Sequence, residues 1–96
     1  MVSPTAHSPV EPDGIQVTVR YFAAARAAAG AESETVVLRP GTTLAQLVER
    51  LAVRESRLAT VLSRCSYLCD GIAVRVQTAA LRPGNTIDVL PPFAGG

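Results

Sequence analysis

The sequence predicts an α+β fold in which a mixed sheet of four or five strands is covered on one face by one main helix. Three observations lead to this prediction. Residues 15–21 alternate apolar and polar side chains, residues 43–52 carry the pattern of a capped amphipathic helix, and residues 86–90 read as a late strand. A length of 96 residues with 48% hydrophobic content suits one domain with one core.

The first predicted elements are two strands joined by a long connection. Residues 15–21 place Ile, Val, Val and Tyr at every second position, so one face of this strand should be buried. The run AAARAAAG (23–30) is helix-prone and ends in Gly30, which predicts a short helix within the connection. Residues 34–38 form the second strand, which Pro40-Gly41 ends. We expect the two strands to pair antiparallel.

The main helix begins at a capping box. In Thr43-Leu44-Ala45-Gln46 the Thr hydroxyl can accept from the Gln46 amide while the Gln46 side chain reaches back. Apolar residues then recur with helical spacing and define one stripe, which should pack on the sheet. The members of this stripe are Leu44, Leu47, Val48, Leu51 and Ala52. Leu58, Val61 and Leu62 indicate a further short helical piece.

The remaining strands follow at short intervals. Residues 67–69 form the third strand and lead into an Asp70-Gly71 turn. Residues 72–76 resume an extended pattern, residues 82–85 form a turn, and residues 86–90 form the last strand. The resulting order is strand, strand, helix, strand, strand, with short additional elements.

Charge and residue types exclude several kinds of function. Nine basic and eight acidic residues leave a formal net charge of +1, so no broad basic face is available for nucleic acid. All nine cations are Arg, which excludes amine nucleophiles from lysine side chains. The single His, His7, lies in the N-terminal stretch, so a Ser/His/Asp or Cys/His catalytic set has no anchored base.

Cys65 and Cys69 are the two cysteines of the chain. Their spacing differs from that of redox loops, and two thiolates are too few for a structural zinc. If both lie on one extended strand, their Cα atoms are about 13 Å apart, beyond the reach of a disulfide. We therefore expect free thiols, no metal site and a reducing, cytoplasmic setting.

Residues 1–14 are predicted to be a disordered N-terminal extension. They contain Pro4, Pro9 and Pro12 but no apolar run and no early basic cluster. We therefore expect neither a secretory signal nor a membrane anchor. Residues 15–96 form the folded domain in this prediction, and residues 91–96 form a mobile C-terminal tail.

Three segments resemble a known family. They are VRYFAAARAAAG (19–30), PGTTLAQLVERLA (40–52) and, most specifically, RPGNTIDVLPPFAGG (82–96). Together they resemble the MoaD/ThiS family of sulfur carriers, and within it most closely the small subunit of molybdopterin synthase. The distinctive part is PP-x-x-GG, with Gly96 expected to be the terminal residue. The family usually has an acidic residue where Asn85 stands and an Asn where Asp70 stands.

The resemblance implies a ubiquitin-like β-grasp fold and a carrier cycle. An ATP-dependent adenylating enzyme would convert the Gly96 carboxylate to an acyl-adenylate, and a sulfur donor would then form the thiocarboxylate. The carrier would next insert its tail into the large catalytic subunit of molybdopterin synthase. In this reading the chain supplies sulfur, is not itself the catalyst and binds no cofactor stably, since the partner uses the ATP.

The tail has the chemistry that such a carrier needs. Pro91 and Pro92 cannot donate to a sheet ladder, so they end the last strand and hold the base of the tail extended. The tail of Pro91, Pro92, Phe93, Ala94, Gly95 and Gly96 can reach roughly 20 Å when extended. The two glycines lack a Cβ, so a narrow channel can close around them while the terminal carbonyl stays open to attack.

A candidate partner interface lies at the root of this tail. Alternation places Arg20 and Phe22 on the outward face of the first strand, and Asp88 and Leu90 on the outward face of the last. In a β-grasp sheet these two strands are parallel neighbours. Phe22 and Leu90 should therefore form one exposed apolar patch opposite the helix, with Arg20 and Asp88 paired behind it.

Two other functions remain as alternatives. One is a sulfur carrier for thiamin or cysteine biosynthesis, which shares the fold and the terminal glycines. The other is a ubiquitin-like binding or modifier module without a sulfur role. Such a module could not build chains on itself through a side-chain amine, because the sequence has no Lys.

A chain that starts at Gly14 should fold and be loaded with sulfur at the same rate as the full chain, because residues 1–13 offer little apolar surface to bury. Urea unfolding and a loading assay with the adenylating enzyme check this. A loss of more than about 1 kcal/mol in the free energy of unfolding would show instead that the extension is docked.

Overall fold

The computed structural model describes residues 14–92 of the chain. Of the predicted disordered extension over residues 1–14, only Gly14 lies within this range, so that prediction is not tested for residues 1–13. The tail residues Phe93, Ala94, Gly95 and Gly96 also lie outside it. Within it, the element order is β1-α1-β2-α2-α3-β3-β4-β5.

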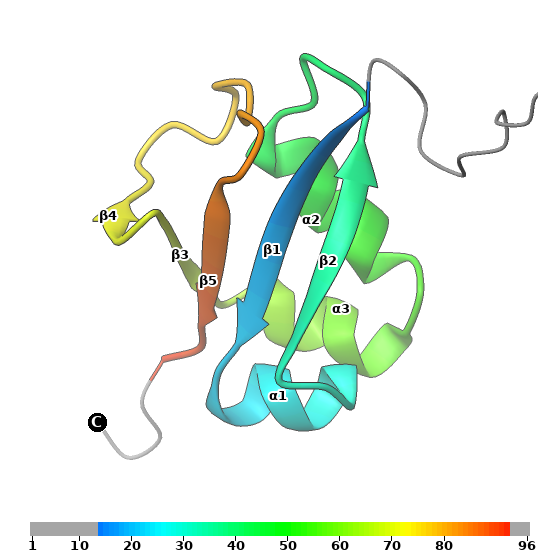
Figure 1. Cartoon of the computed structure of the whole chain (residues 1–96). Coiled ribbons are helices and arrows are strands. Elements are labelled where there is room, and N and C mark those ends of the chain that lie inside the picture. Colours follow the sequence, from blue (N-terminus) through cyan, green and yellow to red (C-terminus); the bar gives the residue numbers. More distant parts are fainter. Residues whose placement is uncertain (1–13, 93–96) are drawn as a thin grey trace, which may run out of the picture.

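The five strands form one mixed sheet (Figure 1). The strand order is β2-β1-β5-β3-β4, in which β1 and β5 are parallel neighbours and the other pairs are antiparallel. This arrangement confirms the predicted mixed sheet and the pairing of the first and last strands. The bounds are β1 Ile15–Tyr21, β2 Ser33–Leu38, β3 Ser66–Cys69, β4 Ile72–Ala73 and β5 Thr86–Leu90.

Three helices pack behind the sheet and along one end of it (Figure 1). They are α1 (Ala23–Ala29), α2 (Leu44–Ala52) and α3 (Ser56–Leu62). The predicted main helix is α2, and both hydrogen bonds of its capping box form, at 3.1 Å to the Thr43 hydroxyl and 3.0 Å to the Gln46 side chain. No helix within residues 14–92 is long and apolar enough to cross a membrane.

The core lies between the sheet and the helices. Val17, Val19 and Tyr21 of β1 and Ile87 and Val89 of β5 are each at most 1% exposed. Burying an aliphatic side chain of this size contributes about 1.5–3 kcal/mol, so the two central strands are held mainly by their inward faces. The helices contribute the rest of this layer through Ala25, Leu44, Leu47, Leu51, Leu58 and Leu62.

A polar network ties β1 to β2 and to the end of α2. The Tyr21 hydroxyl donates to Glu34 Oε2 at 2.6 Å, and Arg54 donates to both Glu34 oxygens at 2.9 and 3.1 Å. Burial would raise the pKa of the Glu34 carboxyl, but hydrogen bonds from Arg54 and Tyr21 outweigh it and lower that pKa. Burial and the bond to Glu34 raise the pKa of the Tyr21 phenol. The Tyr21 hydroxyl, the only polar atom of this buried side chain, therefore has a hydrogen-bond partner.

The prediction of an extended segment over residues 72–76 is wrong, because the strand is shorter. Only Ile72–Ala73 form a strand, which pairs with β3 at two positions. The side chains of Ile72 and Val76 are 73% and 64% exposed, because this edge of the sheet extends beyond the helices and offers them nothing to pack on. The following loop instead turns toward α2, where the Gln77 carbonyl accepts from the Ala45 amide at 3.0 Å.

The two departures from the family pattern, Asp70 and Asn85, contact each other. The Asn85 amide donates to Asp70 Oδ2 at 2.7 Å, while Asp70 Oδ1 accepts from the Thr86 backbone amide at 2.7 Å. Asp70 has a φ of 50° beside Gly71 with a φ of 85°, a left-handed pair that Asp and Asn both tolerate. The resemblance implies an amide and an acid in the reverse order at these two positions, which in this chain are hydrogen-bonded to each other.

Replacing Asn85 by Asp should destabilise the protein, because it sets two carboxylates against each other where an amide now bonds a carboxylate. We expect Asn85→Asp to lower the free energy of unfolding by about 1–2 kcal/mol at neutral pH, measured by urea unfolding. Adding Asp70→Asn restores an amide opposite a carboxylate, so the double variant should regain most of that loss. Additive effects of the two substitutions would show that the contact does not stabilise the turn.

Candidate functional site

The C-terminal segment leaves the domain from the central strand of the sheet, β5. β5 is hydrogen-bonded to β1 on one side and to β3 on the other, and Val89 is fully buried. The Val89 carbonyl also accepts from the Phe22 backbone amide at 3.2 Å, which extends the β1–β5 pairing by one residue beyond the end of β1. Pro91 is half-buried and Pro92 is exposed. The packing of β5 in the core therefore fixes the position from which the tail starts.

The tail residues Phe93, Ala94, Gly95 and Gly96 lie beyond the described residues. Their predicted roles as the threading segment and the covalent site therefore stay predictions. The structure shows the position from which they start, at the end of the sheet where β1 and β5 both finish and where α1 lies (Figure 1).

The predicted strand parity at the tail root is correct. β1 pairs with β5 in the register Arg20↔Asp88 and Tyr21↔Val89, so Phe22 and Leu90 follow at the next position of the two strands. Phe22 is 38% exposed and Leu90 is half-buried, while Tyr21 and Val89 face the core. The two residues thus have the positions required for an apolar patch on the face opposite the helices.

The predicted ion pair behind this patch is also present. Arg20 Nε and Nη2 donate to the two carboxylate oxygens of Asp88 at 2.6 and 2.9 Å. This bidentate contact raises the pKa of Arg20. Asp88 lies on the outward face as predicted, but it is only 6% exposed. The Arg20 guanidinium also lies 5.6 Å from the centre of the Phe22 ring, within the range of a cation–π contact.

The patch includes residues that the sequence analysis did not assign to it. Leu68 of β3 stands opposite Asp88, and Ala73 of β4 stands opposite Leu68, so both share the outward face with Leu90. Leu68 is half-buried and Ala73 is exposed. Alternation around the buried Tyr67 could have indicated that Leu68 points outward. Only the sheet order places it next to β5.

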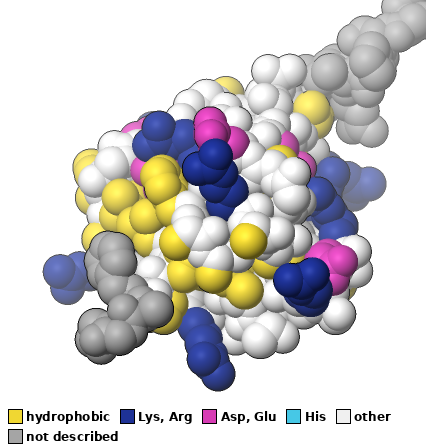
Figure 2. Space-filling model, turned by 90° about the horizontal axis from the view of Figure 1, so that it is seen from below, with side chains coloured by type: hydrophobic (Ala, Val, Ile, Leu, Met, Phe, Trp, Pro, Cys, Tyr) yellow, Lys and Arg dark blue, Asp and Glu magenta, His cyan; other side chains and the backbone are white. Residues whose placement is uncertain are grey.

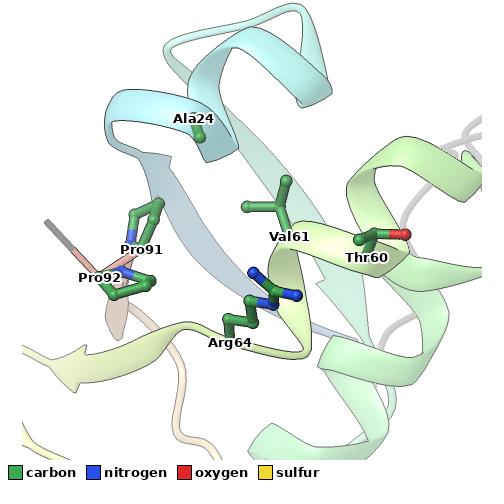
Figure 3. Close-up of a pocket in the computed structure, with 6 residues that line it drawn as sticks. All are labelled: Ala24, Thr60, Val61, Arg64, Pro91 and Pro92. Atoms are coloured by element: carbon green, nitrogen blue, oxygen red, sulfur yellow. The ribbon is translucent and has the colours of Figure 1, made fainter. Parts of the chain in front are cut away.

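The other side of the tail root is a hollow of about 230 Å³. Figure 3 shows Pro91 and Pro92 on one side of it, Ala24 of α1 above it, and Thr60 and Val61 of α3 opposite. The Arg64 side chain points into the space between the prolines and Val61 (Figure 3). Hydrophobic side chains gather on this end of the molecule, with basic side chains around them (Figure 2). The tail root therefore lies between two apolar surfaces.

The surroundings of the two cysteines disfavour the thiolate form. Both are free and half-buried, and the Cys65 thiol contacts the Val61 carbonyl at 3.2 Å. Burial raises the pKa of the Cys65 thiol, and burial together with Asp70 raises that of Cys69, so the nucleophilic thiolate is disfavoured at both. In the described range no group of three or more His, Cys, Asp or Glu side chains is placed to hold a metal ion.

Comparisons with known proteins agree with this geometry. The model of the ThiS family matches residues 19–96 of the chain. The molybdopterin synthase sulfur carrier subunit of Chlamydomonas reinhardtii is 30% identical over 83 residues, which are 85% of this chain and 100% of that protein.

Two solved structures have the same fold at lower identity. The putative molybdopterin converting factor subunit 1 of Pyrococcus furiosus superposes with a TM-score of 0.74 at 24% identity, over 82% of this chain and 99% of that one. A chain from the complex of subunits 1 and 2 of the Helicobacter pylori molybdopterin-converting factor gives a TM-score of 0.60 at 22% identity, over 85% and 100% of the two chains. These matches confirm the predicted β-grasp fold.

Proposed function

Because the chain belongs to the ThiS family, we propose that it is the sulfur carrier subunit of a molybdopterin synthase. The observation that carries this proposal is the position of the tail root. A strand hydrogen-bonded on both sides runs directly into Pro91-Pro92 and the Gly-Gly ending. A rigid base and an extended arm are what a carrier needs to deliver a terminal group into another protein's active site.

The proposed covalent chemistry takes place at the Gly96 carboxylate. A carboxylate is a poor electrophile, so the adenylating enzyme transfers AMP from ATP to one of its oxygens and releases pyrophosphate. A sulfur donor then supplies hydrosulfide, whose sulfur attacks the carbonyl carbon. AMP leaves with that oxygen, the sulfur loses its proton, and the thiocarboxylate remains. When the sulfur passes to a pterin precursor, an oxygen from water restores the carboxylate. Gly96 thus returns to its starting state and can be loaded again.

The proposal gives this chain two protein partners. One is the ATP-dependent adenylating enzyme, and the other is the large catalytic subunit of molybdopterin synthase. The solved complex of subunits 1 and 2 of the Helicobacter pylori factor, whose carrier-like chain shares this fold, supports the second. We place catalysis and ATP binding on the partners and propose that the carrier acts in the cytoplasm, where free thiols such as Cys65 and Cys69 stay reduced.

We call the apolar surface of Phe22, Leu68 and Leu90 the outward patch, and it supplies a contact to the partner in addition to the tail. Ordering two glycines and their neighbours in a channel costs conformational entropy, which other contacts must offset. Phe22 is suited to this role because its ring is partly exposed while its backbone is bonded to β5 and its face is near Arg20. A partner can therefore bury an aromatic side chain that is already held in position.

Two alternatives differ from this proposal in what happens after Gly96 is activated. A carrier for thiamin or cysteine biosynthesis would form the same thiocarboxylate but pass its sulfur to another acceptor. A ubiquitin-like modifier would instead transfer Gly96 to an amine. The similarity to the sulfur carrier subunit of Chlamydomonas reinhardtii, which covers the full length of that protein, favours a role in molybdopterin synthesis over both alternatives.

Incubation with the adenylating enzyme, ATP and a sulfur donor should exchange one oxygen of Gly96 for one sulfur. The measurement is exact-mass analysis of the C-terminal peptide combined with thiol-selective labelling, because oxidation of Cys or Met gives nearly the same mass change. Deleting Gly96 should abolish loading without changing the thermal transition, since a terminal residue contributes little packing.

A double substitution, Cys65→Ser with Cys69→Ser, is the matched control for this assay. It should be loaded to the same extent as the unchanged protein. Sulfur that appears on Cys65 or Cys69 while Gly96 stays unmodified would refute the assignment.

Phe22→Ala should weaken binding of a tail-receiving partner by about 1–3 kcal/mol and leave the free energy of unfolding nearly unchanged. Titration calorimetry and urea unfolding provide the two measurements. Val37→Ala is a matched control, because Val37 is 36% exposed on the same face but pairs with Gln16 at the far end of β1. It should leave binding unchanged.

The opposite pattern would contradict this role for Phe22. If Phe22→Ala costs about 3 kcal/mol or more of folding free energy while partner affinity stays intact, the ring acts as a core residue.

A further inference from the structure

A groove between α1 and α3 continues from the tail root along the end of the molecule. The hollow of about 230 Å³ beside Pro91 and Pro92 and a second one of about 400 Å³ share Ala24, Thr60 and Val61. The second hollow is completed by Ala27, Ala28 and Arg57. The two hollows therefore form one surface, which we call the helix groove.

The groove lies on the sides of the two helices that do not supply the core. Ala25 of α1 and Leu58 and Leu62 of α3 are buried in the core. The residues of α1 that line the groove are all alanines, which make a low floor. The groove side of α3 presents Arg57, Thr60 and Val61, the last two of which lie three and four residues after the first. Arg64 follows just after the end of α3 and lines the hollow beside the prolines.

The charge of the groove is unbalanced. Arg57 and Arg64 are exposed, and neither makes an ion pair with another residue in the range 14–92. By contrast, Arg20, Arg26 and Arg54 are each paired with a carboxylate. The residues that line the two hollows include no Asp or Glu. An apolar floor between two cations matches a ligand that has an apolar side chain and flanking carboxylates.

The groove also lies where a tail-receiving protein must pass. Pro91 and Pro92 form one of its walls, so any protein that encloses the residues after Pro92 comes close to Ala24, Val61 and Arg64. This surface is separate from the outward patch. In Figure 1 α1 lies at one end of the sheet and α3 lies behind it. Phe22 and Leu90 instead belong to the outward face, because each follows the outward Arg20 or Asp88 by two residues.

We propose that the helix groove binds an acidic segment of a tail-receiving protein, with one apolar side chain of that segment on the alanine floor and its carboxylates against Arg57 and Arg64. This inference rests on the proposed function, which supplies the receiving proteins. It adds a second docking surface that acts mainly through charge, and so affects how fast the partner associates and which partner is accepted.

Reversing the two charges tests the proposal. The variant Arg57→Glu with Arg64→Glu is compared with Arg39→Glu and Arg82→Glu, an equal charge change at exposed positions close to where β1 begins, the opposite end of the sheet. Affinities for the purified large catalytic subunit and for the purified adenylating enzyme are measured at low and at high ionic strength. We expect the groove variant to lose about tenfold more affinity than the control for at least one partner, with the difference shrinking at high salt.

A milder pair of variants covers the possibility that charge reversal impairs folding. Ala27 is exposed on α1, so both Ala27→Glu and Ala27→Gln are compatible with the helix. Ala27→Glu should weaken the same partner, because it places a carboxylate on the floor of the groove, and the isosteric Ala27→Gln should weaken it much less. Equal effects of Glu and Gln would overturn the electrostatic assignment.

The same assays separate failure of this inference from failure of the proposed function. If the unchanged protein is loaded on Gly96 but the groove variants bind both partners as well as the control does, the groove is not a docking surface and the proposal is wrong. If the unchanged protein is not loaded at all, the carrier function itself fails.

Discussion

The parallel pairing of β1 with β5 is the constraint on which the rest of this structure depends. It joins the start of the domain to its end, and the Arg20–Asp88 contact that locks it spans 68 positions of sequence. Closing so long a loop costs entropy that no local interaction offsets. The pairing is therefore held by burial of Val17, Val19, Ile87 and Val89, with the ion pair setting the register on the other face. A shift of β5 by one residue against β1 would turn Ile87 and Val89 out of the core.

This pairing also determines where the functional segment begins. Because β5 lies between β1 and β3, the chain reaches Pro91 from the centre of the sheet rather than from a loosely held edge. The two prolines cannot continue the ladder, so the sheet ends abruptly at that point. A carrier benefits from such a boundary, since the rigid strand transmits the position of the docked domain to the residues that enter the partner.

Two surfaces of different character meet at this boundary. On one side is the outward patch around Phe22, Leu68 and Leu90, where Arg20 is neutralised by Asp88 and apolar contact dominates. On the other side is the helix groove, where Arg57 and Arg64 face no carboxylate among the lining residues. Apolar burial contributes affinity at short range, whereas unpaired charge acts at longer range and is sensitive to salt. A carrier that must bind one protein for loading and another for delivery can use such a division.

Most secondary structure was readable from the sequence because it is coded by local chemistry. The alternation in 15–21, the capping box at Thr43 and Gln46, and the prolines after Leu90 each act over a few residues, and the structure has all of the corresponding elements. The parity of Phe22 and Leu90 followed from the same alternation. The tail motif at residues 91–96 identified the family, although its end lies beyond the described residues.

What the tertiary structure alone decided is which distant elements become neighbours. Nothing local to Ile72–Val76 shows that the helices stop short of this edge, so the strand was predicted too long. Leu68 joins the outward patch only through the sheet order, and Asp70 meets Asn85 only because β3 lies beside β5. The helix groove exists because α1 packs against α3, although β2 and α2 separate these two helices in the sequence. Such contacts depend on the summed burial of many side chains, whereas the local motifs each depend on a few adjacent residues.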